Sequence, residues 1–179
     1  MQETENYHDL SDYPEQFSYG TVRYFKNGMA SGFHLQPDTP IAAEPIVVFG
    51  GSEGSSNFPL AEQISEQGYE VYSLFFFGAD NQVDTLNKIL LEFFQDFLDE
   101  AELNNEDITI IGGSKGAELA LVLTNYYNEV HHLVLYTPSS YIYQGLVFNE
   151  EARSSWIWED TEMLYIDITH NPVSLLLSN

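Results

Sequence analysis

The chain contains four short runs of hydrophobic residues, separated by longer segments of mixed polarity. The runs lie at residues 45–49, 69–76, 108–111 and 132–136. A continuous apolar run of this length is typical of a strand that contacts core on both faces, as in a parallel sheet. We therefore predict four core strands in a mainly parallel sheet.

The segments between these runs have helical patterns. Residues 59–67 begin with a proline, which suits a first helical turn, and Gly68 follows them. Residues 83–103 repeat large apolar side chains at a spacing of three to four, which predicts an amphipathic helix. A third helix is expected from Lys115 to about Tyr127. Alternation of strand and helix favours an α/β fold with helices on both faces of the sheet.

The two ends of the chain follow other patterns. Residues 18–25 and 29–35 are rich in β-favouring side chains and flank Asn27-Gly28, which predicts an antiparallel hairpin. We divide the chain into an acidic N-terminal arm at 1–17, a core at 18–140, and a lid-like or edge-covering segment at 141–179. The last segment shows no further strand–helix unit.

The composition and charge of the chain argue against several classes of function. The 179 residues include 28 acidic and 5 basic ones, for a net charge of −23, and no cysteine. A surface without a positive patch is unsuited to nucleic acid or to anionic membranes. Without cysteine, neither a disulfide nor a thiolate metal site can form. The polar, acidic N-terminus is unlike a signal peptide, and we expect a cytoplasmic protein.

One stretch carries a chemical motif. Ile108–Ile111 lead directly into Gly112-Gly-Ser-Lys-Gly116, and a helix-forming run follows. This is G-x-S-x-G between a buried strand and a helix, where a sharp turn exposes the serine at the edge of the sheet. Ser114 is the candidate nucleophile, and the backbone N–H of Lys115 is a candidate oxyanion donor at the helix N-terminus. The alternative is a Gly-rich turn in which Ser114 only caps the helix.

Several segments together resemble the α/β-hydrolase fold, and more narrowly the C-terminal domain of acyl-CoA thioester hydrolases and bile acid-CoA:amino acid N-acyltransferase. The matching pieces are Phe49-Gly-Gly-Ser-Glu-Gly54, Gln67-Gly-Tyr-Glu-Val71, Phe75-Phe-Phe-Gly78, Gly112-Gly-Ser-Lys-Gly-Ala-Glu-Leu-Ala-Leu121, Pro138-Ser-Ser140 and Ser154-Ser-Trp156. The resemblance implies that Ser114 is an acyl-accepting nucleophile used for hydrolysis. It also implies that Ser52 or Glu53 supplies a second oxyanion N–H. Neither a cofactor nor a metal is expected.

The motif needs a base and an acid that the sequence does not supply clearly. In α/β-hydrolases both follow the serine, and only 65 residues remain after Ser114. The final strands of that fold are missing, which favours a truncated chain. His170, in a Thr-His-Asn-Pro turn, follows Ser114 in the right order, with Asp160 and Asp167 just before it, and an exposed loop histidine is its alternative interpretation. His131 and His132 fall at the wrong edge of the sheet.

Three functions remain open at this point. The first is a serine acyl hydrolase of thioesterase type that acts on a small-molecule ester or thioester, although the −23 charge suits a neutral ester better than anionic CoA. The second is a catalytically incomplete hydrolase-fold protein that binds a ligand or partner. The third, phosphate binding by the Gly loops, lacks any Walker pattern. An exposed sheet edge at 132–136 is a possible homo-oligomer contact.

Overall fold

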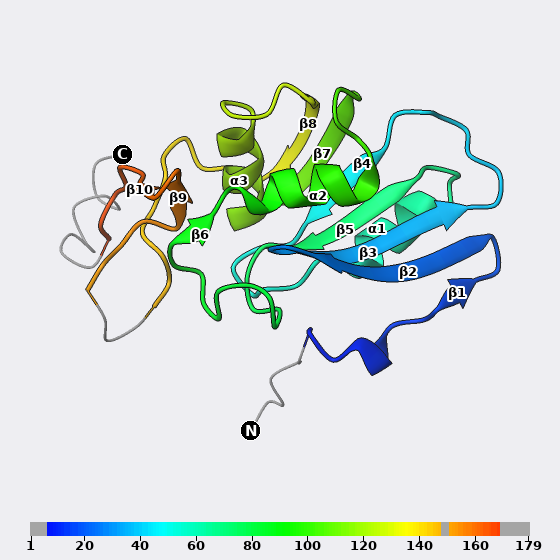
Figure 1. The fold of residues 1–179 in the computed structure, drawn as a ribbon, viewed down its shortest axis with the longest axis horizontal. Helices are drawn as coiled ribbons and strands as arrows, with labels where there is room; N and C mark the ends of the chain where they lie inside the picture. Colours follow the sequence, from blue (N-terminus) through cyan, green and yellow to red (C-terminus); the bar gives the residue numbers. More distant parts are fainter. Residues whose placement is uncertain (1–6, 148–150, 169–179) are drawn as a thin grey trace.

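A computed structural model of the chain describes residues 7–147 and 151–168. Its main feature is a seven-stranded sheet in the order β1-β2-β3-β5-β4-β7-β8, with a separate three-stranded sheet in the order β10-β9-β6 (Figure 1). The elements are η1 (Leu10–Asp12), β1 (Gln16–Phe17), β2 (Gly20–Asn27), β3 (Ala30–Pro37), β4 (Ile46–Phe49), α1 (Phe58–Ser65), β5 (Val71–Phe75), β6 (Ile89–Leu90), α2 (Phe93–Ala101), β7 (Ile108–Gly113), α3 (Lys115–Leu123), β8 (Val130–Tyr136), β9 (Trp156–Trp158) and β10 (Thr161–Glu162).

The four apolar runs form the parallel part of the large sheet. Strands β5, β4, β7 and β8 pair in parallel, and β3 joins them antiparallel along β5. The predicted hairpin is β2 and β3, in which Asn27 pairs with Ala30. Its two turn residues are therefore Gly28 and Met29, one position later than the Asn-Gly pattern indicates, and Gly28 has a positive φ of 52°. The predicted α/β-hydrolase-like architecture is confirmed.

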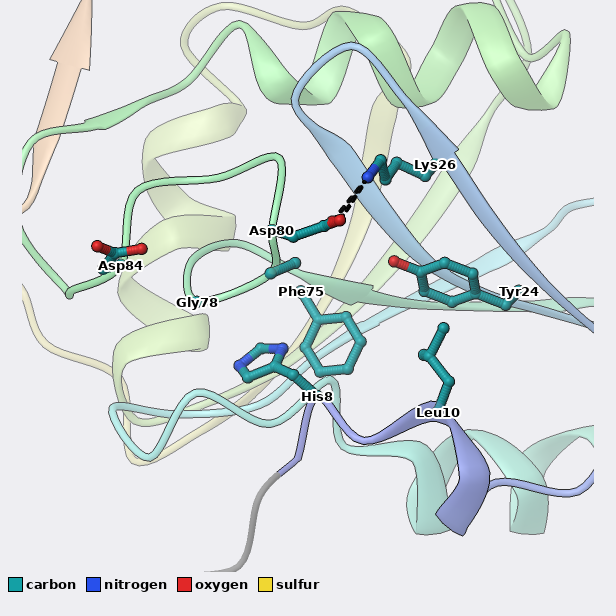
Figure 2. A pocket seen from close by; sticks show the side chains of 9 residues that line it. His8, Leu10, Tyr24, Lys26, Phe75, Gly78, Asp80 and Asp84 are labelled. Carbon is teal, nitrogen blue, oxygen red and sulfur yellow. Dashed lines mark hydrogen bonds and ion pairs between the residues drawn. The ribbon is translucent and has the colours of Figure 1, made fainter.

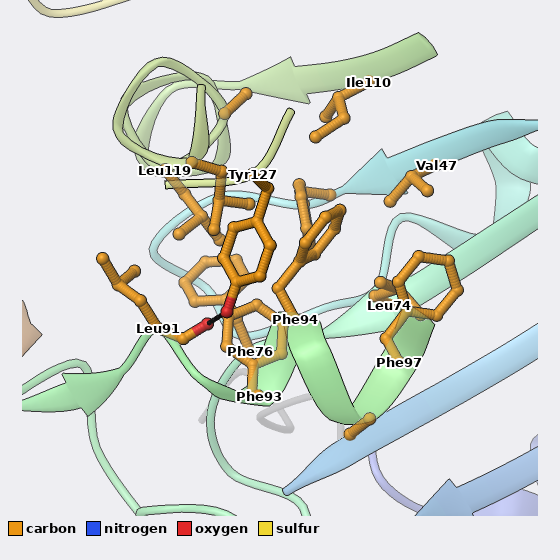
Figure 3. Close-up of a cluster of buried hydrophobic side chains, with 14 of the residues drawn as sticks. Val47, Leu74, Phe76, Leu91, Phe93, Phe94, Phe97, Ile110, Leu119 and Tyr127 are labelled. Carbon is orange, nitrogen blue, oxygen red and sulfur yellow. Dashed lines mark hydrogen bonds between the residues drawn. The ribbon is translucent and has the colours of Figure 1, made fainter. Parts of the chain in front are cut away.

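The helices cover both faces of this sheet. Helix α1 packs Phe58 and Ala61 into a buried cluster with Val48 and Phe75. Helices α2 and α3 pack on the other face, where Phe94, Phe97 and Leu119 belong to the larger cluster (Figure 3). Alternate side chains along a core strand therefore belong to two different buried clusters, one on each face of the sheet, as expected for a strand buried on both faces. None of the helices in the described ranges is long and apolar enough to cross a membrane.

The helix predicted over 83–103 is wrong in its first half. Only Phe93–Ala101 is helical, and residues 89–90 form β6, which pairs in parallel with β9. Backbone N–H groups of Lys88, Ile89 and Leu91 donate to carbonyls of residues 154, 155 and 157 at 2.7–3.0 Å. Leu86 and Ile89 are buried without a helix. These residues have helical spacing in the sequence, but a contact with a segment more than 60 residues away takes the place of the helix.

The two end segments of the chain, predicted as an arm and a lid-like segment, contain short elements of regular structure. The predicted arm contains one turn of 3₁₀ helix, η1, and the short strand β1. The described part of 141–179 contains β9 and β10, which join β6 rather than β8. Strand β8 is therefore the last strand of the large sheet, and Val134 and Tyr136 are exposed on it. Within the described residues, its outer edge has no strand partner.

Candidate active site

Ser114 lies in a sharp turn between β7 and α3. Strand β7 ends at Gly113 and α3 begins at Lys115, so one residue makes the whole connection. Ser114 has φ 51° and ψ −112°, a strained conformation for a residue with a side chain, and it is exposed. Its N–H donates to the Tyr136 carbonyl at 2.9 Å, which holds the turn against β8. Its side chain makes no capping hydrogen bond, so the hydroxyl is not used as the helix cap.

Two glycines make this turn possible. A β-carbon built on Gly116 would lie 2.1 Å from the Gly50 carbonyl oxygen, and one on Gly112 would lie 2.4 Å from the Gly116 carbonyl oxygen. Both contacts are with backbone, which cannot move aside easily. Gly113, the variable position of G-x-S-x-G, has nothing within 4 Å of such a β-carbon. The two glycines of the pattern are thus required by close packing of β7, α3 and the loop after β4.

Ser114 opens into a cleft of about 290 Å³ at the carboxyl ends of β4, β7 and β8. We call it the Ser114 cleft, and its lining consists of Gly50, Gly51, Glu53, Asn57, Gly113, Ser114 and Thr137. Three of these residues, Asn57, Ser114 and Thr137, are non-glycine residues with φ of 58°, 51° and 49°. Such conformations cluster at functional sites, where surrounding structure holds them in place. The sequence did not identify Asn57 and Thr137 as lining residues, because no local sequence pattern indicates a positive φ at these positions.

The N-terminus of α3 offers a hydrogen-bond donor beside Ser114. The first α3 backbone N–H groups that bond within the turn are those of Ala117 and Glu118, which donate to the Ser114 carbonyl. The N–H of Lys115, at the first position of the helix, precedes them. First-turn N–H groups and the positive end of the helix dipole stabilise negative charge. A donor at this position can therefore interact with negative charge beside Ser114.

The Lys115 side chain points away from the cleft into the protein. Its ammonium contacts Glu118 Oε1 at 2.7 Å and the Tyr143 carbonyl at 3.3 Å, and lies 5.5 Å from the centre of the Trp156 ring. Trp156 Nε1 donates to the same Glu118 oxygen at 2.8 Å. Lys115 and Glu118, one helical turn apart, therefore form a buried pair. Burial lowers the pKa of Lys115, against the hydrogen bond to Glu118, which raises it.

Glu53 brings a carboxylate into the Ser114 cleft. Its Oε1 accepts the Gly51 N–H at 2.9 Å and the Ser55 hydroxyl at 2.6 Å. Burial by itself raises the pKa of the Glu53 carboxyl, but these hydrogen bonds outweigh it and hold the pKa below its ordinary value. Ser52, the other candidate oxyanion residue of this loop, is exposed and is not part of the cleft lining. Of the two, the structure brings only Glu53 together with Ser114.

The described histidines lie away from the Ser114 cleft. His131 and His132 are at the amino end of β8, opposite Ser114, where they pair with Asp107 and Glu44. His34 pairs with Glu70 at 2.7 Å and stacks on Tyr72.

His8 lines another pocket, beside Phe75 at the end of β5 and Gly78 in the loop that follows (Figure 2). Burial lowers its pKa. His170, the candidate base, falls outside the described residues, so its role stays a prediction.

Residues 89–175 match the family model described as BAAT / acyl-CoA thioester hydrolase C terminal. The match covers slightly less than half of the chain. It starts at β6 and includes the serine turn, α3 and β9, so the family match covers the Ser114 side of the cleft but not the loop that carries Glu53. No curated protein matches the sequence.

Solved structures share the fold of this chain. A serine hydrolase from Cycloclasticus zankles is 22% identical with a TM-score of 0.53, over 68% of this chain and 46% of that one. An α/β hydrolase from Penicillium sp. sh18 is 14% identical, TM-score 0.51, over 69% and 47%. A proline iminopeptidase-related protein from Thermus thermophilus is 19% identical, TM-score 0.51, over 69% and 46%. The chain spans about half the length of these proteins.

Proposed function

We propose that this chain is a serine acyl hydrolase in which Ser114 attacks the carbonyl carbon of a small ester or thioester. The observation that carries the proposal is the Ser114 turn: an exposed hydroxyl in a strained conformation, not used as a cap, beside the N-terminus of α3. The family match over residues 89–175 supports the same reaction class.

The proposed reaction has two acyl-transfer steps. Ser114 Oγ forms a bond to the acyl carbon while its proton passes to a base, and the carbonyl oxygen becomes an oxyanion. The Lys115 N–H and the loop after β4 are the proposed donors to that oxyanion, each contributing about 3 kcal/mol in well-built sites. The bond to the alcohol or thiol then breaks, the leaving group takes the proton, and water releases the acid in the second step.

The base is the part of the mechanism that rests on sequence order. We propose His170 for this role, because it follows Ser114 as the histidine does in α/β-hydrolases. A histidine base predicts a rate that falls as pH drops through about 6.5. His170→Ala should then lose that limb together with most of the activity.

The test is hydrolysis of p-nitrophenyl butyrate and labelling by a fluorophosphonate probe. The wild type should hydrolyse the ester and take up about one probe per chain, and Ser114→Ala should do neither. Ser140→Ala is the matched control, since Ser140 is an exposed serine outside the Ser114 cleft. Equal labelling of wild type and Ser114→Ala would refute the nucleophile assignment.

A second function is a hydrolase-fold protein that binds a ligand without turnover. It is favoured by the absence of any histidine from the Ser114 cleft over residues 7–147 and 151–168. In that case Ser114 would stay unlabelled in a folded, monodisperse protein. Stoichiometric labelling of Ser114 would exclude it.

A further inference from the structure

We infer that Glu53 makes the Ser114 cleft selective for neutral and cationic esters or thioesters over anionic ones, CoA thioesters included. The inference rests on the proposed hydrolase function and names the substrate class of the same site. It departs from the substrate that the family description suggests.

Glu53 is held at the cleft by its own loop. Its carboxylate accepts hydrogen bonds from Gly51 and Ser55 at Oε1. The other oxygen, Oε2, lies toward the end of β7: a β-carbon built on Gly51 would be 2.6 Å from it and 3.6 Å from the Gly113 carbonyl oxygen. Gly113 immediately precedes Ser114. Because Glu53 and Ser114 line the same cleft, we expect a leaving group on an acyl carbon bonded to Ser114 to lie near this carboxylate.

The charge of Glu53 is not balanced by a cation in the cleft. Among the lining residues that the structure describes, Glu53 carries the only ionisable side chain. Four of the five basic residues are already paired with acids elsewhere: Arg23 with Glu100, Lys26 with Asp80, Lys115 with Glu118, and Arg153 with Glu162. Lys115 is the nearest in sequence, but its ammonium is buried and neutralised. The net charge of −23 adds to the repulsion of anions.

In this arrangement the Glu53 carboxylate acts as a fixed negative charge and not as a general base. The hydrogen bonds that it accepts keep it ionised at neutral pH, and they are donated by Gly51 and Ser55 rather than by Ser114. A carboxylate with a lowered pKa is also a weak proton acceptor. Its effect on catalysis is therefore expected through the charge of the substrate. For one unit charge at several ångströms near a protein surface, that effect is about tenfold in kcat/KM.

The experiment compares thioesters that share one acyl group and one assay, the release of a free thiol. S-butyrylthiocholine is cationic, S-methyl thiobutyrate is neutral, S-butyryl-3-mercaptopropionate is a small anion, and butyryl-CoA is a large one. We expect kcat/KM of the wild type to fall from cationic to neutral to anionic substrates. Glu53→Gln keeps the size of the side chain and an acceptor for Gly51, and should lower the cation-to-anion ratio by about tenfold or more. The neutral thioester serves as the reference in each protein, so that the ratio between charged substrates, and not the absolute rate, tests the charge.

Glu106→Gln is the matched control, because it removes the same charge from an exposed position before β7, at the opposite end of the sheet. It should leave the ratio unchanged. An unchanged ratio in Glu53→Gln, or a wild type that prefers butyryl-CoA, would overturn the inference while Ser114-dependent hydrolysis keeps the proposed function. A wild type that hydrolyses none of the four and stays unlabelled at Ser114 would overturn both.

Discussion

The buried pair of Lys115 and Glu118 gives the sharpest test of the structure itself. The side chains are only 8% and 4% exposed, and the ammonium lies 2.7 Å from Glu118 Oε1. Lys115→Met keeps a long apolar stem but removes the charge. The Glu118 carboxylate would then be buried with one neutral donor, Trp156 Nε1 at 2.8 Å. Breaking a buried pair by removing one partner costs about 3–5 kcal/mol.

That cost is large enough to measure by thermal and urea unfolding. In a domain of this size it corresponds to a decrease in Tm of about 10 °C. Arg23→Met is the control, because its pair with Glu100 is exposed, at 55% and 27%, and such pairs contribute about 0–1 kcal/mol. The double variant Lys115→Met/Glu118→Gln should recover part of the loss, since no buried charge remains. A Lys115→Met variant within about 1 kcal/mol of Arg23→Met would refute the buried pair.

The remaining predictions concern packing and pH. Gly116→Ala should lower the free energy of unfolding by about 3 kcal/mol or fail to fold, because its β-carbon would lie 2.1 Å from the Gly50 carbonyl oxygen. The control Gly113→Ala should unfold close to the wild-type midpoint. Equal unfolding midpoints of the two variants would contradict the close packing at Gly116. The hydrogen bond from Arg153 lowers the pKa of Glu162 from 4.5, so this pair should add stability above that pH and lose it as pH falls through the lower folded-state pKa. Arg153→Met should therefore reduce the difference in unfolding free energy between about pH 6 and pH 3, and Arg23→Met should not alter it as much. Ser114→Ala should abolish ester hydrolysis, and Glu53→Gln should lower the ratio of kcat/KM for cationic over anionic thioesters by about tenfold or more, as described above.

The sequence alone determined the local parts of this protein. The four core strands, the hairpin and the serine turn were predictable because each depends on neighbouring residues: apolar runs, a glycine turn, and G-x-S-x-G between strand and helix. Gly112 and Gly116 were identifiable as constrained positions for the same reason, since the pattern itself reports a steric requirement.

Tertiary structure decided what depends on residues far apart in the chain. The pairing of β6 with β9 overrode the helical spacing of residues 83–92, because backbone hydrogen bonds to residues 154–157 replaced those of a helix. The partners of Lys115 include Trp156, and the cleft joins Glu53, Ser114 and Thr137 from three loops. Whether a charged residue is buried, and which acid shares a cleft with the serine, follow from how the strands are ordered in the sheet, and no local pattern encodes that order.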